Sequence, residues 1–359
     1  MIKTGSDFSG VGAFDQALRK LGINYQTVYA CDWDKYSRQT YIENYGEPKY
    51  FPKDVYEREI PKESLDLYMT SPPCQAFSLA GKRKGEDDDR GVLFYNSQEF
   101  IQKNNPRYFI FENVRGLLSD ANGLTFKVWL DMLGGKSVNG NPVLFPNENS
   151  TPYHIYWQVL NAKHYGVPQN RERVFIIGIR DDADNTFRFP KTQHLNKKLK
   201  DVLEHNVHNK YFLSEKMVKH LKHYDRSQKP ITENTKIVNC ITANYAKQSS
   251  DLQYLKIKSA TNKGYEIATN QDSINFSVLN SKTRRGRVGK GVAQTLDTAC
   301  NQGVINSNNI RRLTPRECFR LMDFPEDFKW SVSDTQAYKQ AGNSIVVNVL
   351  AEIINKLKL

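Results

Sequence analysis

Hydrophobic and polar positions along this chain follow the periods expected of alternating strands and helices. Short apolar runs typical of buried strands occur at residues 3–8, 26–31, 65–69, 107–111 and 174–179. Segments with helical character occur at residues 14–21, 35–44, 92–103 and 315–322, and at the end of the segment 340–350. Strands that alternate with helices are typical of a mostly parallel sheet covered by helices. We therefore predict an α/β fold with a Rossmann-like core.

The boundaries of two segments carry further signals. Thr314 is a suitable N-cap, Pro315 fits the first helical position, and Glu317 completes a capping box. We expect the apolar helix within residues 340–350 to pack back onto the first strands and close the domain. Between residues 181 and 310 the periodicity weakens and polar residues dominate, so we expect a second, smaller and less regular unit there.

The first strand, turn and helix have the form of a nucleotide-type binding unit. The turn Phe8-Ser9-Gly10-Val11-Gly12 lets the backbone approach a ligand, and the helix that follows offers free N–H groups. The second strand ends in Asp32-Trp33-Asp34, which places an acid for ribose hydroxyls beside an aromatic ring for a purine. Asp32 is also a candidate N-cap for the helix from about Lys35, and the two roles are compatible. Asp54 is placed to accept from an exocyclic amine.

A cysteine stands on a stiff corner after the third strand. In Thr70-Ser71-Pro72-Pro73-Cys74-Gln75-Ala76-Phe77-Ser78, the two prolines end the strand and fix the backbone. A polar, glycine-flanked loop follows at residues 81–91. The plain alternative is a buried cysteine beside a proline turn. A nucleophile presented at the edge of the sheet is the other interpretation.

A carboxylate and two arginines accompany this cysteine. Glu112 emerges from the apolar strand 107–111, where desolvation of a carboxylate is costly. We therefore expect Glu112 to have a functional role. The alternative is a salt bridge in the core. Cys74 and Glu112 lie at the ends of neighbouring predicted strands of one sheet, which places both at the carboxyl edge where open α/β sheets bind ligands. Arg171 and Arg173 alternate at the start of another buried strand.

Charge changes the picture in the middle of the chain. The 359 residues contain 51 Lys and Arg against 39 Asp and Glu, a formal net charge of +12. Residues 1–180 hold 22 basic and 21 acidic side chains, whereas residues 181–300 hold 21 and 12. The densest basic stretch is the glycine-rich loop 282–291, suited to phosphate and groove contacts unless it is merely a solvated loop. We therefore expect a nucleic-acid partner and place its contact in this region.

Other features argue against several classes of protein. The cysteines are odd in number and form no CxxC pair, so we expect neither a disulfide framework nor a metal site. No signal peptide or bilayer-spanning apolar run is present, and we expect a cytoplasmic protein without a membrane partner. No Walker lysine motif is present, so phosphate chemistry is not expected.

Taken in order, the motifs resemble the DNA (cytosine-5)-methyltransferases of bacterial restriction–modification systems. The matching stretches are Phe8-Ser9-Gly10-Val11-Gly12, Pro72-Pro73-Cys74-Gln75, Glu112-Asn113-Val114, Gln169-Asn170-Arg171-Glu172-Arg173, Arg312-Leu313-Thr314-Pro315-Arg316-Glu317 and Gln340-Ala341-Gly342-Asn343-Ser344. The resemblance implies an S-adenosylmethionine-dependent methyltransferase domain at residues 1–190, completed by residues 313–359, and a smaller, irregular target-recognition domain at residues 191–312. It also implies double-stranded DNA as substrate, a bacterial cytosolic location and protection of host DNA from a partner restriction endonuclease. We expect a monomer.

The resemblance also assigns roles to residues. Cys74 would add to carbon 6 of a flipped-out cytosine, Glu112 would hold a proton on ring N3, and Arg173, with Arg171 more loosely, would brace the carbonyl and the carboxylate. The implied cofactor residues are Phe8, Gly10, Val11, Gly12, Asp32, Trp33, Asp54, Val55, Pro73, Leu93, Asn343 and Ser344. The expected DNA contacts are Gln75, Ser78, Arg90, Arg284, Arg285, Arg287 and Thr295. The loop 78–97 would form a lid over the target base.

Two alternatives keep the scaffold and change the function. One is a tRNA cytosine-5 methyltransferase, against which the long basic insert argues. The other is a catalytically inert DNA-binding protein, against which the presence of Cys74, Glu112 and Arg173 argues. Methyl incorporation into duplex DNA compared with tRNA distinguishes a DNA methyltransferase from the tRNA methyltransferase. Covalent trapping by 5-fluorocytosine DNA distinguishes an active enzyme from the inert DNA-binding protein.

Overall fold

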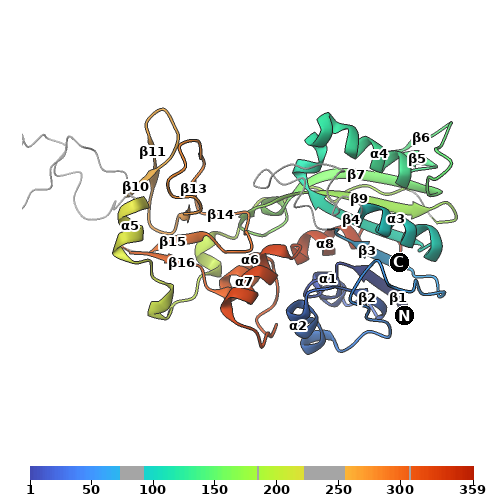
Figure 1. Cartoon of the computed structure of the whole chain (residues 1–359), viewed down its shortest axis with the longest axis horizontal. Helices are drawn as coiled ribbons and strands as arrows, with labels where there is room; N and C mark the ends of the chain where they lie inside the picture. Colours follow the sequence, from blue (N-terminus) through green and yellow to red (C-terminus); the bar gives the residue numbers. More distant parts are fainter. Residues whose placement is uncertain (73–92, 184–185, 222–254, 307–308) are drawn as a thin grey trace, which may run out of the picture.

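The computed structural model describes residues 1–72, 93–183, 186–221, 255–306 and 309–359. Figure 1 shows a large lobe, which holds a central sheet between helices, and a small lobe of short strands beside it. Both chain ends lie in the large lobe, near each other. None of the helices in the described ranges is long and apolar enough to span a membrane.

One mixed sheet of eight strands forms the centre of the large lobe, in the order β2-β1-β3-β4-β9-β7-β5-β6. Its strands are β1 (Ile2–Asp7), β2 (Tyr25–Cys31), β3 (Leu67–Thr70), β4 (Tyr108–Val114), β5 (Ser137–Val138), β6 (Asn141–Pro142), β7 (Tyr153–Asn161) and β9 (Glu172–Arg180). The first four run parallel, whereas β9 pairs antiparallel with both β4 and β7. Each predicted strand is present, and the predicted α/β class is confirmed.

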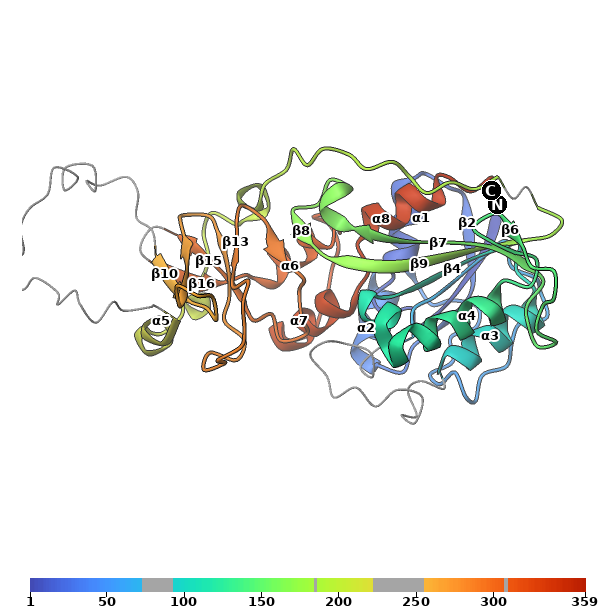
Figure 2. The same cartoon turned by 90° about the horizontal axis from the view of Figure 1, so that it is seen from above.

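Helices cover both faces of this sheet (Figure 2). The helices in the described residues are α1 (Ala13–Lys20), α2 (Lys35–Tyr45), α3 (Leu93–Asn104), α4 (Leu124–Leu133), α5 (Glu215–Leu221), α6 (Pro315–Leu321), α7 (Asp334–Asn343) and α8 (Val347–Ile354), of which α5 lies in the small lobe. Apolar side chains of α1 and α8 share one buried cluster with Leu67 and Ile110 of the sheet. Those of α3 and α4 share a second cluster with Tyr68 and Phe109 on the other face. The terminal helix therefore packs against α1 and the same face of the first strands, as predicted.

Local signals explain where two helices begin. In α6 the Thr314 hydroxyl accepts from the Glu317 N–H at 3.2 Å, and the Glu317 carboxylate accepts from the Thr314 N–H at 2.8 Å. This is the predicted capping box. In α2 the N-cap is Asp34, whose carboxylate accepts from the N–H groups of Tyr36 and Ser37. The interpretation of Asp32 as this N-cap was wrong, since the helix begins one residue after Asp34.

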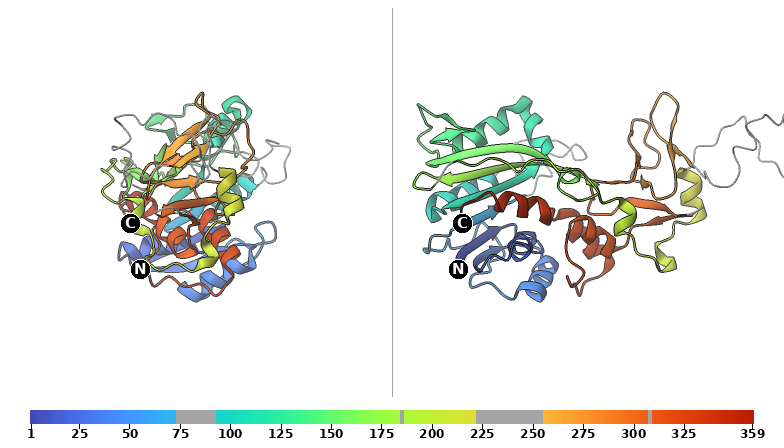
Figure 3. Two further views of the ribbon diagram at one scale, coloured as in Figure 1. Left: turned by 90° about the vertical axis from the view of Figure 1, so that its left-hand side faces the viewer. Right: turned by 180° about the vertical axis from the view of Figure 1, so that it is seen from behind.

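The small lobe has short strands and a core of its own (Figure 3). Its strands are β10 (Leu255–Lys258), β11 (Tyr265–Ala268), β12 (Ser273–Asn275), β13 (Val288–Gly289), β14 (Ala293–Gln294), β15 (Gln302–Asn306) and β16 (Asn309–Arg312). Ile257, Ile274, Phe276, Ile305 and Ile310 fill its core. The two-residue strand β8 (Gln169–Asn170), just before β9, pairs with β14 and so joins the two lobes through backbone hydrogen bonds.

Candidate active site

The strand order creates a binding crevice at the carboxyl ends of the first strands. Strand β1 lies between β2 and β3, so the chain leaves β1 on one side and returns on the other. Open α/β sheets bind ligands at such a switch point, outside the carboxyl ends of the strands. A pocket lies at this point, lined by residues 6–11, 13 and 14, by Ser37 of α2, by Met69 of β3 and the following Ser71, and by Gln340 and residues 343–345. The predicted cofactor turn and the predicted Asn343-Ser344 pair thus share one pocket.

The turn after β1 is held in a backbone shape that favours glycine. Gly10 and Gly12 have φ angles of 55° and 81°, and a Cβ on Gly12 would lie 2.2 Å from the Tyr45 ring. Phe8 also has a positive φ, 55°, which is costly for a bulky residue and is found where function imposes it. Glycine at positions 10 and 12 therefore permits the shape of this turn, and Gly10 itself lines the pocket.

Asp32 faces this turn from the end of β2. One carboxylate oxygen accepts from the Gly10 N–H at 2.8 Å, and the other accepts from the Asp34 N–H at 2.9 Å. Burial raises the pKa of Asp32 to about 6, although these two backbone hydrogen bonds oppose the shift. The neighbouring Trp33 side chain is 83% exposed. An acceptor with free lone pairs and an open indole ring thus stand side by side near the turn.

The other predicted cofactor residues are spread over nearby segments. Asp54 is exposed, and its carboxylate accepts from the Tyr56 N–H at 2.9 Å. Val55 is buried, and so is Leu93, the first residue of α3. Pro73, Cys74, Gln75, Ser78 and Arg90 lie outside the described residues.

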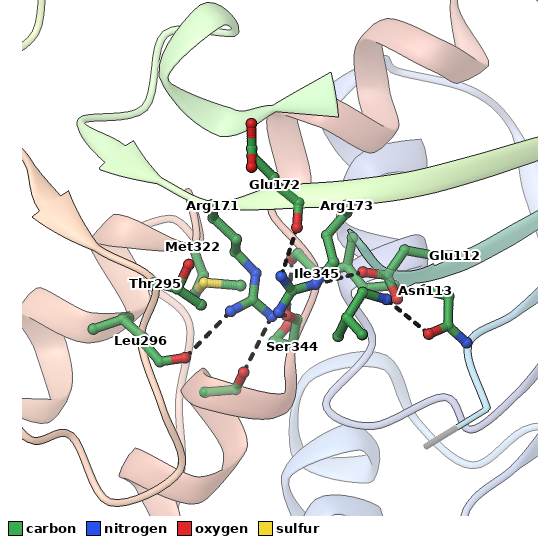
Figure 4. A network of polar contacts seen from close by, with 12 residues as sticks. Glu112, Asn113, Arg171, Glu172, Arg173, Thr295, Leu296, Met322, Ser344 and Ile345 are labelled. Atoms are coloured by element: carbon green, nitrogen blue, oxygen red, sulfur yellow. Dashed lines mark hydrogen bonds and ion pairs between the residues drawn. The ribbon is translucent and has the colours of Figure 1, made fainter. Parts of the chain in front are cut away.

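Glu112 and Arg173 form a buried ion pair at the same edge of the sheet (Figure 4). The Arg173 Nε lies 3.0 Å from Glu112 Oε1, with the two side chains 15% and 9% exposed. Glu112 lies near the carboxyl end of β4, which ends at Val114, in agreement with the prediction. Burial raises the pKa of Glu112, and the positive charges of Arg173 and Arg171 oppose this. The carboxyl group can therefore hold a proton closer to neutral pH than an exposed glutamate can.

The strands that precede Cys74 and carry Glu112 are direct neighbours. β3 pairs in parallel with β4, and Thr70 lies opposite Phe111. Glu112 therefore lies one residue beyond this pair, next to Ser71 of the pocket. The prediction that these are neighbouring strands of one sheet is confirmed.

Arg171 has a different environment from Arg173. It is buried, and its guanidinium donates to three backbone carbonyls: Leu296 at 3.3 Å, Gly342 at 3.1 Å and Ser344 at 2.7 Å (Figure 4). These contacts join the segment after β14 to the segment that lines the cofactor pocket. The structure thus places Arg171 as a link between the lobes, with its donors turned to the backbone.

Gln169 shares this task and was missed by sequence reasoning. Its side chain is fully buried, donates to the Leu321 carbonyl at 2.7 Å and accepts from the Leu296 N–H at 3.2 Å. The available signal was its place in the motif with Arg171. Thr295, beside Leu296, is exposed, and its hydroxyl donates to the Asn170 carbonyl at 2.9 Å.

The predicted basic loop contains one arginine that faces inward. Arg287 is 2% exposed, and its guanidinium donates to the carbonyls of Asn275, Ser277 and Val278. Arg287 is therefore a structural residue of the small lobe, and its inclusion among the DNA contacts is corrected. Arg285 is exposed, with its Nε donating to the Ala260 carbonyl, and Arg284 is half-buried.

Among the described residues, no group of His, Cys, Asp and Glu side chains is placed to hold a metal ion. Three cysteines of this part, Cys31, Cys300 and Cys318, are buried free thiols. The Sγ atoms of Cys300 and Cys318 lie 3.3 Å apart.

Comparisons of the sequence with known proteins give a consistent result. The family model of the C-5 cytosine-specific DNA methylases matches residues 2–359. The Type II methyltransferase M.HhaI of Haemophilus parahaemolyticus is 32% identical over an alignment of 356 residues that covers 96% of this chain and 91% of the relative. The Type II methyltransferase M.HpaII of Haemophilus parainfluenzae is 32% identical over an alignment of 347 residues that covers 95% of this chain and 84% of the relative.

Solved structures resemble the whole chain. A putative DNA modification methyltransferase encoded within an E. coli prophage has a TM-score of 0.63 at 20% identity, covering 99% of this chain and 98% of that one. The Dnmt2 methyltransferase of S. pombe has a TM-score of 0.58 at 17% identity, covering 99% and 97%. At these identities the likeness establishes the fold, and it confirms the predicted Rossmann-like class.

Proposed function

Since this chain belongs to the C-5 cytosine-specific DNA methylases and its relatives are Type II methyltransferases, we propose that it methylates carbon 5 of a flipped-out cytosine within a short duplex DNA sequence. Family membership itself establishes DNA cytosine-5 methylation of the restriction–modification type. The observation that supports the finer proposal is the buried Glu112–Arg173 pair beside the switch-point pocket.

Residues in and near the pocket suit S-adenosylmethionine, the proposed methyl donor; Asp32 and Trp33 are not part of the pocket lining, and Asp32 contacts it through Gly10. Asp32 accepts from only one N–H at each oxygen, so lone pairs remain for the ribose hydroxyls. Trp33 presents an open ring to a purine, and the Phe8–Gly12 turn brings backbone N–H groups close. Asn343 and Ser344 line the pocket on its other side. When bound, this cofactor supplies an electrophilic methyl group on a sulfonium.

Carbon 5 of cytosine is a poor nucleophile, and the residues of this chain must activate it. A Cys74 thiolate that adds to carbon 6 gives the ring enamine character at carbon 5. Glu112 holds a proton on ring N3, a role that the raised pKa of its buried carboxyl group favours. Arg173 orients that carboxyl group and stabilises charge that develops on the ring. After transfer, loss of the carbon 5 proton to a base releases Cys74.

We also propose which parts of the chain serve DNA. Residues 191–312 are the target-recognition domain, and they contain most of the basic excess. Exposed groups of this region, among them Arg285 and Thr295, are available for DNA contacts. The target base must leave the stack, because its ring atoms are inaccessible inside a duplex. A partner restriction endonuclease, a monomeric state and a cytosolic location stay predictions.

The proposed reaction is tested with S-adenosylmethionine that carries a tritiated methyl group. The protein is incubated with duplex DNA, with single-stranded DNA and with tRNA, and each product is digested to nucleosides. We expect label in 5-methyldeoxycytidine from duplex DNA alone. Label in tRNA, or in a methylated base other than 5-methylcytosine, would contradict the proposal. Bisulfite sequencing of a methylated DNA library then identifies the recognised site.

A further inference from the structure

A fully buried polar network lies beneath the cofactor pocket. Asp7, the last residue of β1, forms an ion pair with Arg58, with Nη2 and Oδ2 3.1 Å apart and side chains 0% and 1% exposed. The hydroxyls of Tyr29 and Tyr68 donate to the two oxygens of Asp7 at 2.5 Å and 2.6 Å. The Arg58 guanidinium also lies over the Phe100 ring, 5.5 Å from its centroid.

A buried ion pair such as Asp7–Arg58 contributes little net stability to a protein interior. Desolvation of two charges offsets most of their attraction, and apolar residues of similar volume are often as stabilising or more so. A guanidinium does, however, fix the relative positions of several acceptors, because its planar N–H donors have a rigid geometry.

Arg58 holds three segments that each carry proposed cofactor residues. Its Nη1 donates to the carbonyl of Val55, which is itself one of those residues. Its Nη2 donates to the carbonyl of Asn96 in α3 at 2.7 Å, one turn after Leu93. Its charge partner Asp7 lines the pocket and directly precedes Phe8.

We infer that Arg58 is a positioning residue for S-adenosylmethionine, which sets the loop around Val55, the start of α3 and the turn after β1 at their working separation. At 1% side-chain exposure it is screened from the pocket, so it acts through these segments. The inference rests on the proposed function, because it concerns the cofactor of that site. It extends that function to a residue that belongs to none of the sequence motifs.

The test compares Arg58→Met with Arg311→Met. Arg311 is the matched control, since it forms another buried ion pair, with Glu317, with side chains 2% and 0% exposed, and neither residue lines the cofactor pocket. Cofactor affinity is measured by calorimetry with S-adenosylmethionine, stability by thermal unfolding, and the maximal rate at saturating cofactor. We expect Arg58→Met to raise the dissociation constant about tenfold or more while the maximal rate changes less than about threefold. Arg311→Met should lower the unfolding temperature and leave the dissociation constant unchanged.

Two results would overturn the inference. One is wild-type cofactor affinity in folded Arg58→Met. The other is an equal loss of affinity in both variants at equal loss of stability, which would indicate general destabilisation. If Arg58→Met does not fold, Arg58→Lys is measured instead; weaker cofactor binding in this charge-preserving variant supports the inference, and unchanged binding overturns it. Failure of the wild-type protein to bind the cofactor would count against the proposed function, which keeps the two failures distinguishable.

Discussion

Glu112 and Asp32 are two acids whose pKa values are raised by burial, and the proposed mechanism gives them opposite tasks. Glu112 must carry a proton to the ring, so a raised pKa helps it. Asp32 must accept hydrogen bonds from a ribose, so a raised pKa limits the pH range in which it works. The two side chains therefore predict different responses to mutation and to pH.

Glu112→Gln should remove the transferable proton and keep the shape of the side chain. We expect the single-turnover rate of methyl transfer to fall about 10²–10⁴-fold, the range for loss of a general acid. Cofactor affinity should stay close to that of the wild type, because Glu112 does not line the cofactor pocket. A rate within tenfold of the wild type would return Glu112 to a purely structural ion pair with Arg173.

Cofactor affinity should rise as the pH increases through about 6 and level off at higher pH, because the carboxylate form of Asp32 accepts from ribose and its pKa in the free protein is about 6. The stability of the free protein should change in the opposite direction. A raised pKa stabilises the protein below the unfolded value of 3.8, and this contribution is lost as pH rises through about 6. Calorimetry between pH 5 and pH 8 measures the first effect.

Asp32→Asn is the control for this pH dependence, since it cannot titrate. Its cofactor affinity should be lower than that of the wild type by about 1.5–3 kcal/mol at neutral pH and flat across the range. A wild-type profile that is equally flat would show that Asp32 does not contact the cofactor.

At the scale of elements, the hydrophobic pattern predicted much of the large lobe. The strands, the capping box of α6 and the packing of the last helix follow from period, capping chemistry and an apolar face, all of which are local. The sequence alone could not distinguish Asp32 from Asp34 as the N-cap of α2, because the answer depends on which carboxylate lies near the free N–H groups of the helix. In the structure, the carboxylate of Asp32 accepts from the Gly10 N–H instead.

The two inward-facing arginines mark the limit of sequence reasoning. Arg287 lies in a glycine-rich basic stretch, yet it is buried on three carbonyls of its own lobe. Arg171 was grouped with Arg173 by alternation, yet its partners are carbonyls from segments more than a hundred residues away. A basic stretch of sequence predicts exposed side chains. Only the folded structure shows which arginines are instead buried and donate to backbone carbonyls.

Arg171→Met should loosen the junction between the lobes. Three buried carbonyls lose their donor, so we expect the free energy of unfolding to fall by about 2–4 kcal/mol. Arg115→Met is the matched control, because Arg115 is 63% exposed and pairs with Glu172 at the surface. That change should stay within about 0.5 kcal/mol. Urea unfolding of both variants measures the difference, and equal losses would contradict the role assigned to Arg171.

At the scale of the whole molecule, the chemistry is expected in the large lobe and recognition of the DNA sequence in the small lobe. Arg284 and Arg285 stay candidates for DNA contacts after Arg287 is set aside. Replacement of a base-contacting arginine by Ala should weaken the binding free energy at the cognate site by about 1–3 kcal/mol and relax the base specificity at one position. A phosphate-binding one should weaken all duplexes alike and lower the salt dependence by about one ion. Binding to cognate and scrambled duplexes at several salt concentrations separates these outcomes.

Arg287→Met serves as the internal comparison for this loop. It should lower stability and leave the salt dependence of DNA binding unchanged, because its guanidinium is buried on carbonyls. If Arg284→Ala and Arg285→Ala weaken both duplexes equally, this loop grips phosphates and the base-reading residues lie elsewhere in residues 191–312.

The covalent role of Cys74 is the central claim, and trapping tests it most directly. A duplex that carries 5-fluorocytosine at the target position cannot lose fluorine from carbon 5, so the adduct persists after methyl transfer. With S-adenosylmethionine, the wild-type protein should form a complex with this duplex that survives denaturation, and peptide mapping should locate the modified base on Cys74. Cys74→Ser should form none while still binding the duplex. A wild-type protein that methylates normal DNA yet forms no such complex, or forms it at another residue, would contradict the mechanism.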